Sequence, residues 1–470
     1  MKGRYRKYDT EQMSFLILDV NSFLKDNPLV KIIDEFVDDH IEIEDFTKNL
    51  NNSDTGAPAI HPAAMLKVLF YAFSKKRYSS RDIEAGINED VGIRYLAREQ
   101  TIDHSTIARF IAEYSLPIQK FFSKMTYILA QSGYVDFDLV AIDGTKIKAN
   151  AGEEFYGNAK DFREKRDRLN SKIKNLLNET SITKKERDTV EKKLKRFQQS
   201  KKKIDDFLKE IESGEKDEKS KYHLNDSDST IQKGNFLGYN AQIGVDKKHH
   251  FIVSGLVSTN ASDRIQLIPV LERIPTVPYK ITADAGYFSS GNLMYADANN
   301  MDLYMPEGRG EGGKRRFRNE YFNSRDCEIL DSRSKIKKIR CPGGQTLETD
   351  YAGNDRGNLT YRFYPDHQKC NTCSKRSVCI RGESYKCFRI KKEYLESTPL
   401  REKMRRKLIS KKGRRIYSDR ACTVEHVFGN IKEHFNFTKF FYRKVEKAET
   451  IWNIICTAYN FRRLVNLRYL

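Results

Sequence analysis

Three acidic residues from distant parts of the chain, Asp143, Asp284 and Glu425, could form one site. Asp143 and Asp284 each come directly after an apolar stretch that predicts a buried strand. Glu425 lies in a segment with helical spacing, whose apolar side consists of Val424, Val427, Phe428 and Ile431. Carboxylates from separate segments can bind Mg²⁺ together if the fold brings them close. Taken alone, each motif has a simpler interpretation, namely a turn at Asp143-Gly144 and an amphipathic helix with solvated charges.

The segment around Glu425 has further polar residues at regular spacing. Tyr417 and Arg420 precede Glu425, and Lys432 follows it. Glu425, Phe428 and Lys432 are three and seven residues apart, which places them on one face of a regular helix. A carboxylate and an ammonium on the same face as an apolar core residue are unusual, and they indicate a functional surface.

Composition sets the class of protein and of partner. The chain has 470 residues, enough for about three domains. It contains 85 Lys and Arg against 65 Asp and Glu, a formal net charge of +20. This surplus favours a polyanionic partner, with nucleic acid first and an acidic membrane surface second. No apolar run is long enough to span a bilayer and no signal-peptide core follows the first residues, so we expect a cytoplasmic, nucleoid-associated protein.

Residues 1–130 are predicted to be helical. His61-Pro62 begins an apolar helix, and Asp103 caps a later one. Short helices joined by tight turns, with exposed basic residues, suit a helix-turn-helix-like DNA-binding domain. A plain helical bundle is an equal alternative, because no base-reading helix can be identified.

Strand patterns begin after residue 130, with a strand before Asp143. Two more strands follow Gly238, then a helix over Asn260–Ile274, a strand before Asp284 and a helix after Ser289. With the helix of Glu425 last, this order predicts an RNase H-like α/β core that is interrupted twice. The core is assigned to residues 131–152, 222–300 and 415–470. The interruptions are a charged helical hairpin with a heptad seam at 153–221 and a Cys-rich insertion at 301–414.

Four of the eight cysteines have spacing that suits zinc. Cys341 heads the turn sequence CPGGQ, and Cys370, Cys373 and Cys379 follow in KCNTCSKRSVC. Four thiolates beside turn residues can close a tetrahedron around Zn²⁺. The segment 319–362 shows no clear helical or strand period, so we expect it to gain order from metal binding. Reduced, unligated thiols are the alternative, and Cys422 and Cys456, on apolar helical stretches, are predicted to be core residues.

Taken together, these motifs resemble bacterial insertion-sequence transposases of the DDE class, in the branch with a Tyr-Arg-Glu-Lys signature. The resemblance covers nearly the whole chain and includes AIDGTKIKANAG, GYNAQIGVD, ITADAGYFS, the Cys-rich insertion and SDRACTVEHVFGNIK. It implies that Asp143, Asp284 and Glu425 are the catalytic, metal-binding triad. It also implies that Tyr417, Arg420 and Lys432 hold transposon-end DNA. Four residues separate Arg420 from Glu425, one more than in the best-known form of the signature.

The function implied by this resemblance is cleavage at the ends of an insertion sequence and strand transfer into target DNA. Two Mg²⁺ or Mn²⁺ ions would activate the attacking oxygen and stabilise the leaving one. The expected partners are the terminal inverted repeats, target DNA and a second copy of the chain in a homodimer. Two alternatives are an RNase H-like nuclease without strand transfer and a catalytically inactive DNA-binding protein of the same fold.

Overall fold

The computed structural model describes residues 26–47, 59–178, 184–308, 322–355, 357–380 and 386–468. The chain divides into two compact units, Met1–Phe110 with Ala458–Leu470, and Ile111–Thr457. The last helix, α18 (Val445–Arg468), contributes residues to both units. Among the helices of the described residues, none is long and apolar enough to cross a membrane.

The first unit is helical. Its elements are α2 (Pro28–His40), α3 (Ile43–Thr47), α4 (Pro62–Ser74), α5 (Ser80–Glu89), α6 (Val91–Leu96) and most of α7 (His104–Glu113). The helix α4 begins where the sequence predicts, since the His61 side chain accepts a hydrogen bond from the Ala63 N–H and caps it. Every residue of α4 is buried, including Lys67, whose ammonium is 2.6 Å from carboxylate oxygens of both Asp34 and Asp38. Paired charges of this kind let a lysine lie inside the unit.

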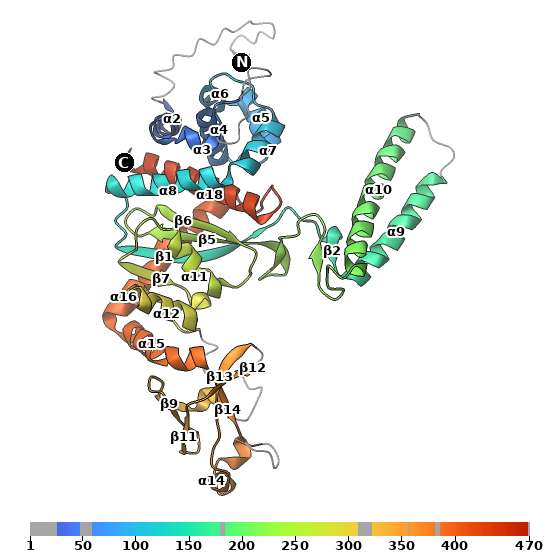
Figure 1. The fold of residues 1–470 in the computed structure, drawn as a ribbon. Helices are drawn as coiled ribbons and strands as arrows, with labels where there is room; N and C mark the ends of the chain where they lie inside the picture. Colours follow the sequence, from blue (N-terminus) through green and yellow to red (C-terminus); the bar gives the residue numbers. More distant parts are fainter. Residues whose placement is uncertain are drawn as a thin grey trace, which may run out of the picture. The chain divides into compact units, whose positions relative to one another are not determined.

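The second unit contains a six-stranded mixed sheet, so the prediction of an α/β protein is confirmed (Figure 1). Its strands are β1 (Leu139–Lys148), β4 (Thr230–Gln232), β5 (Phe236–Asp246), β6 (Ile252–Ser258), β7 (Lys280–Ala283) and β8 (Asp302–Tyr304). The sheet order is β4-β5-β1-β7-β8, and β6 also pairs with β5. The pairs β1–β5 and β5–β6 are antiparallel, whereas β1–β7 and β7–β8 are parallel. The strand β8 belongs to this sheet although it falls within the segment assigned to the Cys-rich insertion.

The structure corrects two local expectations about this unit. Asp143 does not end its strand, and the alternative of a turn at Asp143-Gly144 is wrong, because β1 continues through this pair and pairs with β5 as far as Lys148. The helix expected over Asn260–Ile274 is instead a 3₁₀ turn, η2 (Asp263–Ile265), followed by α11 (Leu267–Glu272). Ser262 caps η2, as a helix start signal should, but the regular helix begins only later. The helix α12 (Ser290–Ala298) begins after Ser289 as expected.

The helix α18 packs directly on the sheet. A Cβ added to Gly255 of β6 would lie 3.3 Å from the Cys456 sulfur and 3.5 Å from the Trp452 ring. The Trp452 indole N–H donates to the Gln242 carbonyl of β5 at 2.9 Å. The prediction that Cys456 is a core residue is confirmed, since its side chain is fully buried.

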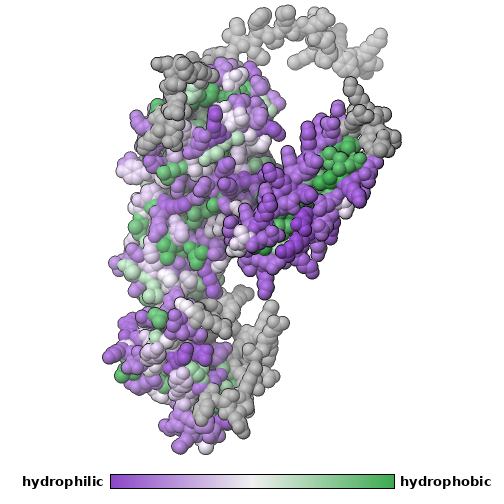
Figure 2. Space-filling view, turned by 45° about the vertical axis from the view of Figure 1, so that its right-hand side comes forward, coloured by the Kyte–Doolittle hydropathy of each residue, from purple (hydrophilic) through white to green (hydrophobic). Residues whose placement is uncertain are grey.

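The charged segment after β1 forms two antiparallel helices, α9 (Ala159–Leu177) and α10 (Lys184–Glu212), which lie side by side in Figure 1. At the base of this hairpin they bury a small core of their own, formed by Ala159, Phe162, Ile204, Phe207 and Leu208. Figure 2 shows a mostly hydrophilic hairpin surface with a hydrophobic patch near the free end, where Leu177 is 63% exposed. Of the heptad seam, Phe162, Ile204 and Leu208 are buried at the base, whereas Leu176 and Val190 nearer the tip are half-buried.

The Cys-rich segment does build a core, contrary to the sequence prediction. It contains two three-stranded sheets, with strands β9 (Glu328–Asp331), β10 (Lys337–Arg340), β11 (Thr346–Thr349), β12 (Ala352–Asp355), β13 (Asn358–Phe363) and β14 (Phe388–Lys391). Buried residues shared by the two sheets include Ile339, Leu347, Phe363 and Phe388. The strands are only four to six residues long, which is why no period was visible in the sequence.

Candidate active site

Asp143 and Asp284 meet at one edge of the six-stranded sheet. In the parallel pair β1–β7, Ile142 lies opposite Ala283. Asp143 and Asp284 are the next residues on each strand, so their side chains leave neighbouring backbones at the same level. The Gly144 N–H donates to Asp143 at 2.8 Å, and the Gly286 N–H donates to Asp284 at 2.7 Å. These local bonds hold the two carboxylates in place.

The segment with Glu425 is helical from Lys411 to His434, but it is not one regular helix. It consists of α16 (Lys411–Arg420), a π turn at Ala421–Glu425, α17 (His426–Gly429) and a second π turn at Asn430–His434. The predicted apolar side is confirmed, since Val424, Val427, Phe428 and Ile431 are all buried.

The prediction that Glu425, Phe428 and Lys432 share a face is wrong. Phe428 is 8% exposed, whereas Glu425 and Lys432 point to solvent. A π turn closes over five residues instead of four, and it therefore shifts the face on which each later side chain lies. The prediction that Cys422 is a core residue is also wrong, since its side chain is exposed on the first π turn.

Arg420 connects this helical segment to the sheet. Its Nη1 is 3.0 Å from Asp143 Oδ2, and its Nη2 is 3.4 Å from Glu425 Oε1. The guanidinium carbon also lies 6.0 Å from the centre of the Tyr417 ring, within range of a cation–π contact. The Arg420 and Asp143 side chains are 14% and 20% exposed, and that of Glu425 is 62% exposed. One guanidinium thus bridges a half-buried and an exposed carboxylate.

Burial has the largest effect on the pKa values of this site. Burial raises the pKa of Asp143 from 3.8 to about 6, and the charge of Asp284 adds to the increase. The Gly144 N–H and Arg420 act in the opposite direction, because both favour the ionised form. Burial also raises the pKa of Tyr417, with Asp284 and Asp143 contributing, so this phenol lies close to both aspartates.

The structure therefore brings together five of the six residues singled out for catalysis and DNA contact: Asp143, Asp284, Tyr417, Arg420 and Glu425. Lys432 is the exception. It is exposed on the second π turn and forms no ion pair within the described part of the chain.

A buried polar network beside this site was missed in the sequence. Asp263 Oδ1 accepts hydrogen bonds from Lys146 Nζ at 2.9 Å, Asn240 Nδ2 at 2.8 Å and Gln242 Nε2 at 2.9 Å. The Tyr287 hydroxyl donates to Gln242 Oε1. Burial raises the pKa of Tyr287 well above its usual value, and the charges of Asp143, Asp263 and Asp284 raise it further, so the network adjoins the carboxylates. The available signal was the alternation of two polar residues in the otherwise apolar strand GYNAQIGVD.

Gly144 is required by this network. A Cβ at Gly144 would lie 2.1 Å from Gln242 Nε2, so any larger residue would displace the amide. The glycine of the Asp143-Gly144 pair thus serves close packing between β1 and β5 rather than a turn.

The carboxylate oxygens of this site are suitable ligands for a hard divalent cation. The side chains that carry them are not arranged around one metal position. Asp143 and Glu425 contact one guanidinium, Asp284 lies beside Asp143, and carboxylate oxygens are the donors that Mg²⁺ prefers. Among the described residues, however, no three His, Cys, Asp or Glu side chains are arranged so that they could hold a metal ion.

The four cysteines singled out for zinc lie in two segments that touch. Cys341 begins the tight turn between β10 and β11, where the Gly344 N–H donates to the Cys341 carbonyl. A Cβ added to Gly343 would lie 2.8 Å from the Cys373 sulfur and 3.6 Å from the Cys341 sulfur. Burial raises the pKa of Cys370 and of Cys379, and the neighbouring thiols raise both further. Among the described residues, these cysteines too are not arranged as a group of three or more ligands that could hold a metal ion.

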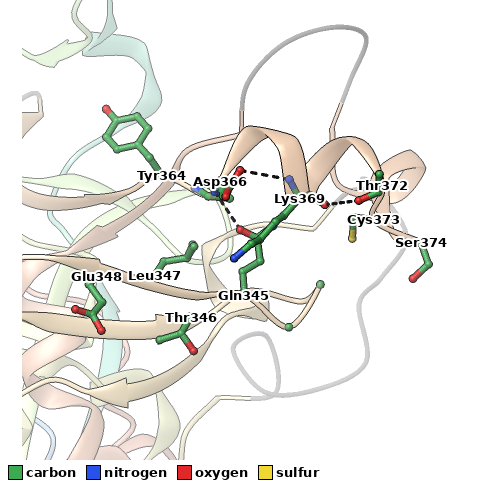
Figure 3. Close-up of a pocket in the computed structure, with 13 residues that line it drawn as sticks. Gln345, Thr346, Leu347, Glu348, Tyr364, Asp366, Lys369, Thr372, Cys373 and Ser374 are labelled. Atoms are coloured by element: carbon green, nitrogen blue, oxygen red, sulfur yellow. Dashed lines mark hydrogen bonds between the residues drawn. The ribbon is translucent and has the colours of Figure 1, made fainter.

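Gln345 and Lys375 hold these two segments together. The Gln345 backbone N–H donates to the Cys341 sulfur at 3.3 Å, and its side-chain amide donates to the Cys370 sulfur at 3.6 Å. The Lys375 ammonium donates to the Pro342 carbonyl at 2.8 Å. Beside them is an open cleft of about 950 Å³, lined by Gln345, Asp366 and Cys373 among others (Figure 3). This cleft contains none of the acidic residues of the sheet edge.

The mixed sheet thus carries two neighbouring aspartates, Asp143 within β1 and Asp284 just after β7, and Arg420 joins Asp143 to Glu425 of the helical segment. Residues 340–465 match the Transposase DDE domain family, and residues 18–113 match the Transposase domain (DUF772) family. The chain is a DDE-type insertion-sequence transposase. This family consists of DNA-binding, DNA-cleaving enzymes that generally use Mg²⁺ or Mn²⁺. No curated protein matches the chain.

Proposed function

We propose that this transposase cleaves the ends of its insertion sequence and joins them to target DNA at a centre formed by Asp143, Asp284 and Glu425. One observation carries the proposal. Asp143 of β1 lies next to Asp284, which follows the parallel strand β7, and Arg420 links Asp143 to Glu425 on a separate helical segment. This arrangement gathers carboxylates from separate segments, as two-metal phosphodiester chemistry requires.

We also infer that the core of the second unit is RNase H-like. The order β6-β5-β1-β7-β8, with three antiparallel strands followed by two parallel ones, supports this inference. The division expected from the sequence gives the core residues 131–152, 222–300 and 415–470, the hairpin 153–221 and the Cys-rich insertion 301–414. Because β8 pairs with β7, the second piece of the core extends to Tyr304 and the insertion begins after it. Residues 1–130 would be the DNA-binding domain.

The roles of the individual residues follow from their positions. Two divalent ions held by the three carboxylates would supply the charge that activates the attacking oxygen and stabilises the leaving one. Arg420 neutralises Asp143 and Glu425 in the free protein, and the same guanidinium can donate to a DNA phosphate. Tyr417 fixes the guanidinium by its ring, and the exposed Lys432 is free to contact the backbone of transposon-end DNA.

The pKa of Asp143 gives this site a predictable response to pH. In the folded protein that pKa is raised from 3.8 to about 6, so protonated Asp143 stabilises the fold at low pH, and this contribution is lost as the pH rises through about 6. Cleavage needs the ionised carboxylate, and its rate should therefore fall as the pH drops through about 6. Arg420→Ala should move this fall to higher pH, because Arg420 lowers the pKa of Asp143.

The measurement is the rate of Mg²⁺-dependent cleavage from below pH 6 to above neutrality. Arg420→Lys is the matched control, since it keeps a positive charge but loses the two-pronged contact. An Arg420→Ala profile that falls at the same pH as the wild type would show that the guanidinium does not set the ionisation of Asp143.

The test of the whole function is an assay for joined products. Purified full-length protein is incubated with Mg²⁺, a labelled duplex from the DNA that flanks its gene, and a circular target plasmid. We expect label to be joined covalently to the target. Cleavage without joining would establish the nuclease alternative, and neither product would favour the inactive DNA-binding protein.

We further propose that Cys341, Cys370, Cys373 and Cys379 bind one structural zinc ion. The contact between their two segments, and the N–H donors of Gln345 directed at two of the sulfurs, support this proposal. Because the segment has an apolar core of its own, zinc would fix the end that carries α14 (His367–Asn371) rather than organise the whole segment.

A further inference from the structure

The helices α15 (Lys392–Ile409) and α16 both have many basic residues, but these residues fall into two groups. On α15 the positive charges have acidic partners within the protein. These pairs are Lys392 with Glu396, Arg401 and Arg405 with Glu307, Lys403 with Asp297, Arg406 with Glu402, and Lys407 with Asp302. They are accounted for by the fold itself.

On α16 three cations remain without such partners. Lys411, Lys412 and Arg415 are exposed, and within the described ranges none of them forms an ion pair or a side-chain hydrogen bond. Arg414 differs, because its guanidinium donates twice to the Ile409 carbonyl, at 2.9 and 2.8 Å, and so caps the end of α15. The outer face of α16, defined here as Lys411, Lys412 and Arg415, is therefore uncompensated positive charge.

This face belongs to the same helix that reaches the acidic site. Tyr417 and Arg420 occupy the last turn of α16 and approach Asp143 and Asp284. An acidic centre repels the phosphates that it must bind, so nearby positive charge is needed to hold DNA there. A cation on α16 can supply that attraction without neutralising the carboxylates themselves.

We propose that the outer face of α16 binds the phosphate backbone of the cleaved strand, about two to four nucleotides from the scissile phosphate. This assignment rests on the proposed function. With a helical rise of about 1.5 Å per residue, Arg415 and Lys411 lie roughly 8 and 14 Å along the axis from Arg420. Phosphates on one strand of a duplex recur about every 3.4 Å along its axis, which gives the range of two to four nucleotides.

The test compares two double variants that lose the same charge. Lys412→Gln/Arg415→Gln removes unpaired cations of α16, whereas Lys403→Gln/Arg406→Gln removes exposed cations of α15 that have partners. The affinity of the full chain for a labelled duplex from the gene-flanking DNA is measured in EDTA at several salt concentrations. The α16 variant should lower the slope of log K against log salt by about two, and the α15 variant should leave it unchanged. Equal slopes in both variants would overturn the proposal.

Neutral methylphosphonates then locate the contact. Placed about two to four nucleotides from the cleavage point, they should weaken binding by the wild type and have no added effect on the α16 variant. An added effect in that variant, or none in the wild type, would place the contact elsewhere. The proposed function is tested separately. Cleavage by the Asp143→Asn variant shows whether Asp143 is catalytic, and this result does not depend on the salt slope of DNA binding.

Discussion

Asp143→Asn, Asp284→Asn and Glu425→Gln are each expected to reduce Mg²⁺-dependent strand cleavage by about 10³-fold or more. Each substitution keeps the size of the side chain but removes a negative charge and a strong metal ligand. If two-ion chemistry contributes several kcal/mol to the transition state, losing a ligand costs about 4 kcal/mol, or roughly a thousandfold in rate. Binding to transposon-end DNA should survive, because it depends on other surfaces. Single-turnover cleavage and gel-shift measurements on the same preparations check both expectations.

Asp419→Asn is the matched control for these variants. Asp419 lies beside Arg420 on α16, but it pairs with Lys247 at the surface instead of facing the two aspartates. Its loss should leave cleavage within a few-fold of the wild type. Near-normal cleavage by any one of the three carboxylate variants would remove that residue from the catalytic centre.

The second large effect concerns the Cys-rich segment. Wild-type protein should contain about one zinc ion per chain, and Cys370→Ser/Cys373→Ser should contain none. Structural zinc contributes roughly 10 kcal/mol or more to the folding of the segment that binds it. The double variant should therefore become sensitive to proteolysis around residues 341–380, while the six-stranded sheet stays folded. Metal analysis and limited proteolysis with mass spectrometry measure the two effects.

Cys422→Ser provides the control, because Cys422 is exposed on the π turn and far in sequence from the four thiols. It should keep its zinc and its resistance to protease. Zinc-free wild-type protein with an equally resistant segment would show that the thiols are unligated and that the apolar core alone maintains the local fold.

Patterns that repeat over a whole element could be predicted from the sequence. The strands around GYNAQIGVD, the hairpin helices and the buried side of the Glu425 segment were all visible in apolar spacing. Local interruptions could not be predicted. Asp143-Gly144 has the composition of a turn, but β5 pairs with it and Gln242 fills the space left by the glycine. Pairing with β5 therefore outweighed the preference of this residue pair for a turn.

The site shows the same division. The two aspartates were marked by the strands before them, whereas Asp263 gave no such signal, because its three donors come from β1 and β5. The link from Arg420 to Glu425 could not be inferred either, since side chains five residues apart do not meet on a regular α-helix. Only the turn at Ala421–Glu425 makes that contact possible.

That turn has a consequence for how relatives of this chain are recognised. An extra residue in a helix is absorbed locally when one turn closes over five residues, and the helical segments on both sides keep their own contacts. The distance between Arg and Glu in the linear motif can then change by one while the guanidinium still reaches the carboxylate. A search that requires fixed spacing would reject such chains. Comparison should allow a one-residue gap between Arg420 and Glu425 and score the two flanking blocks separately.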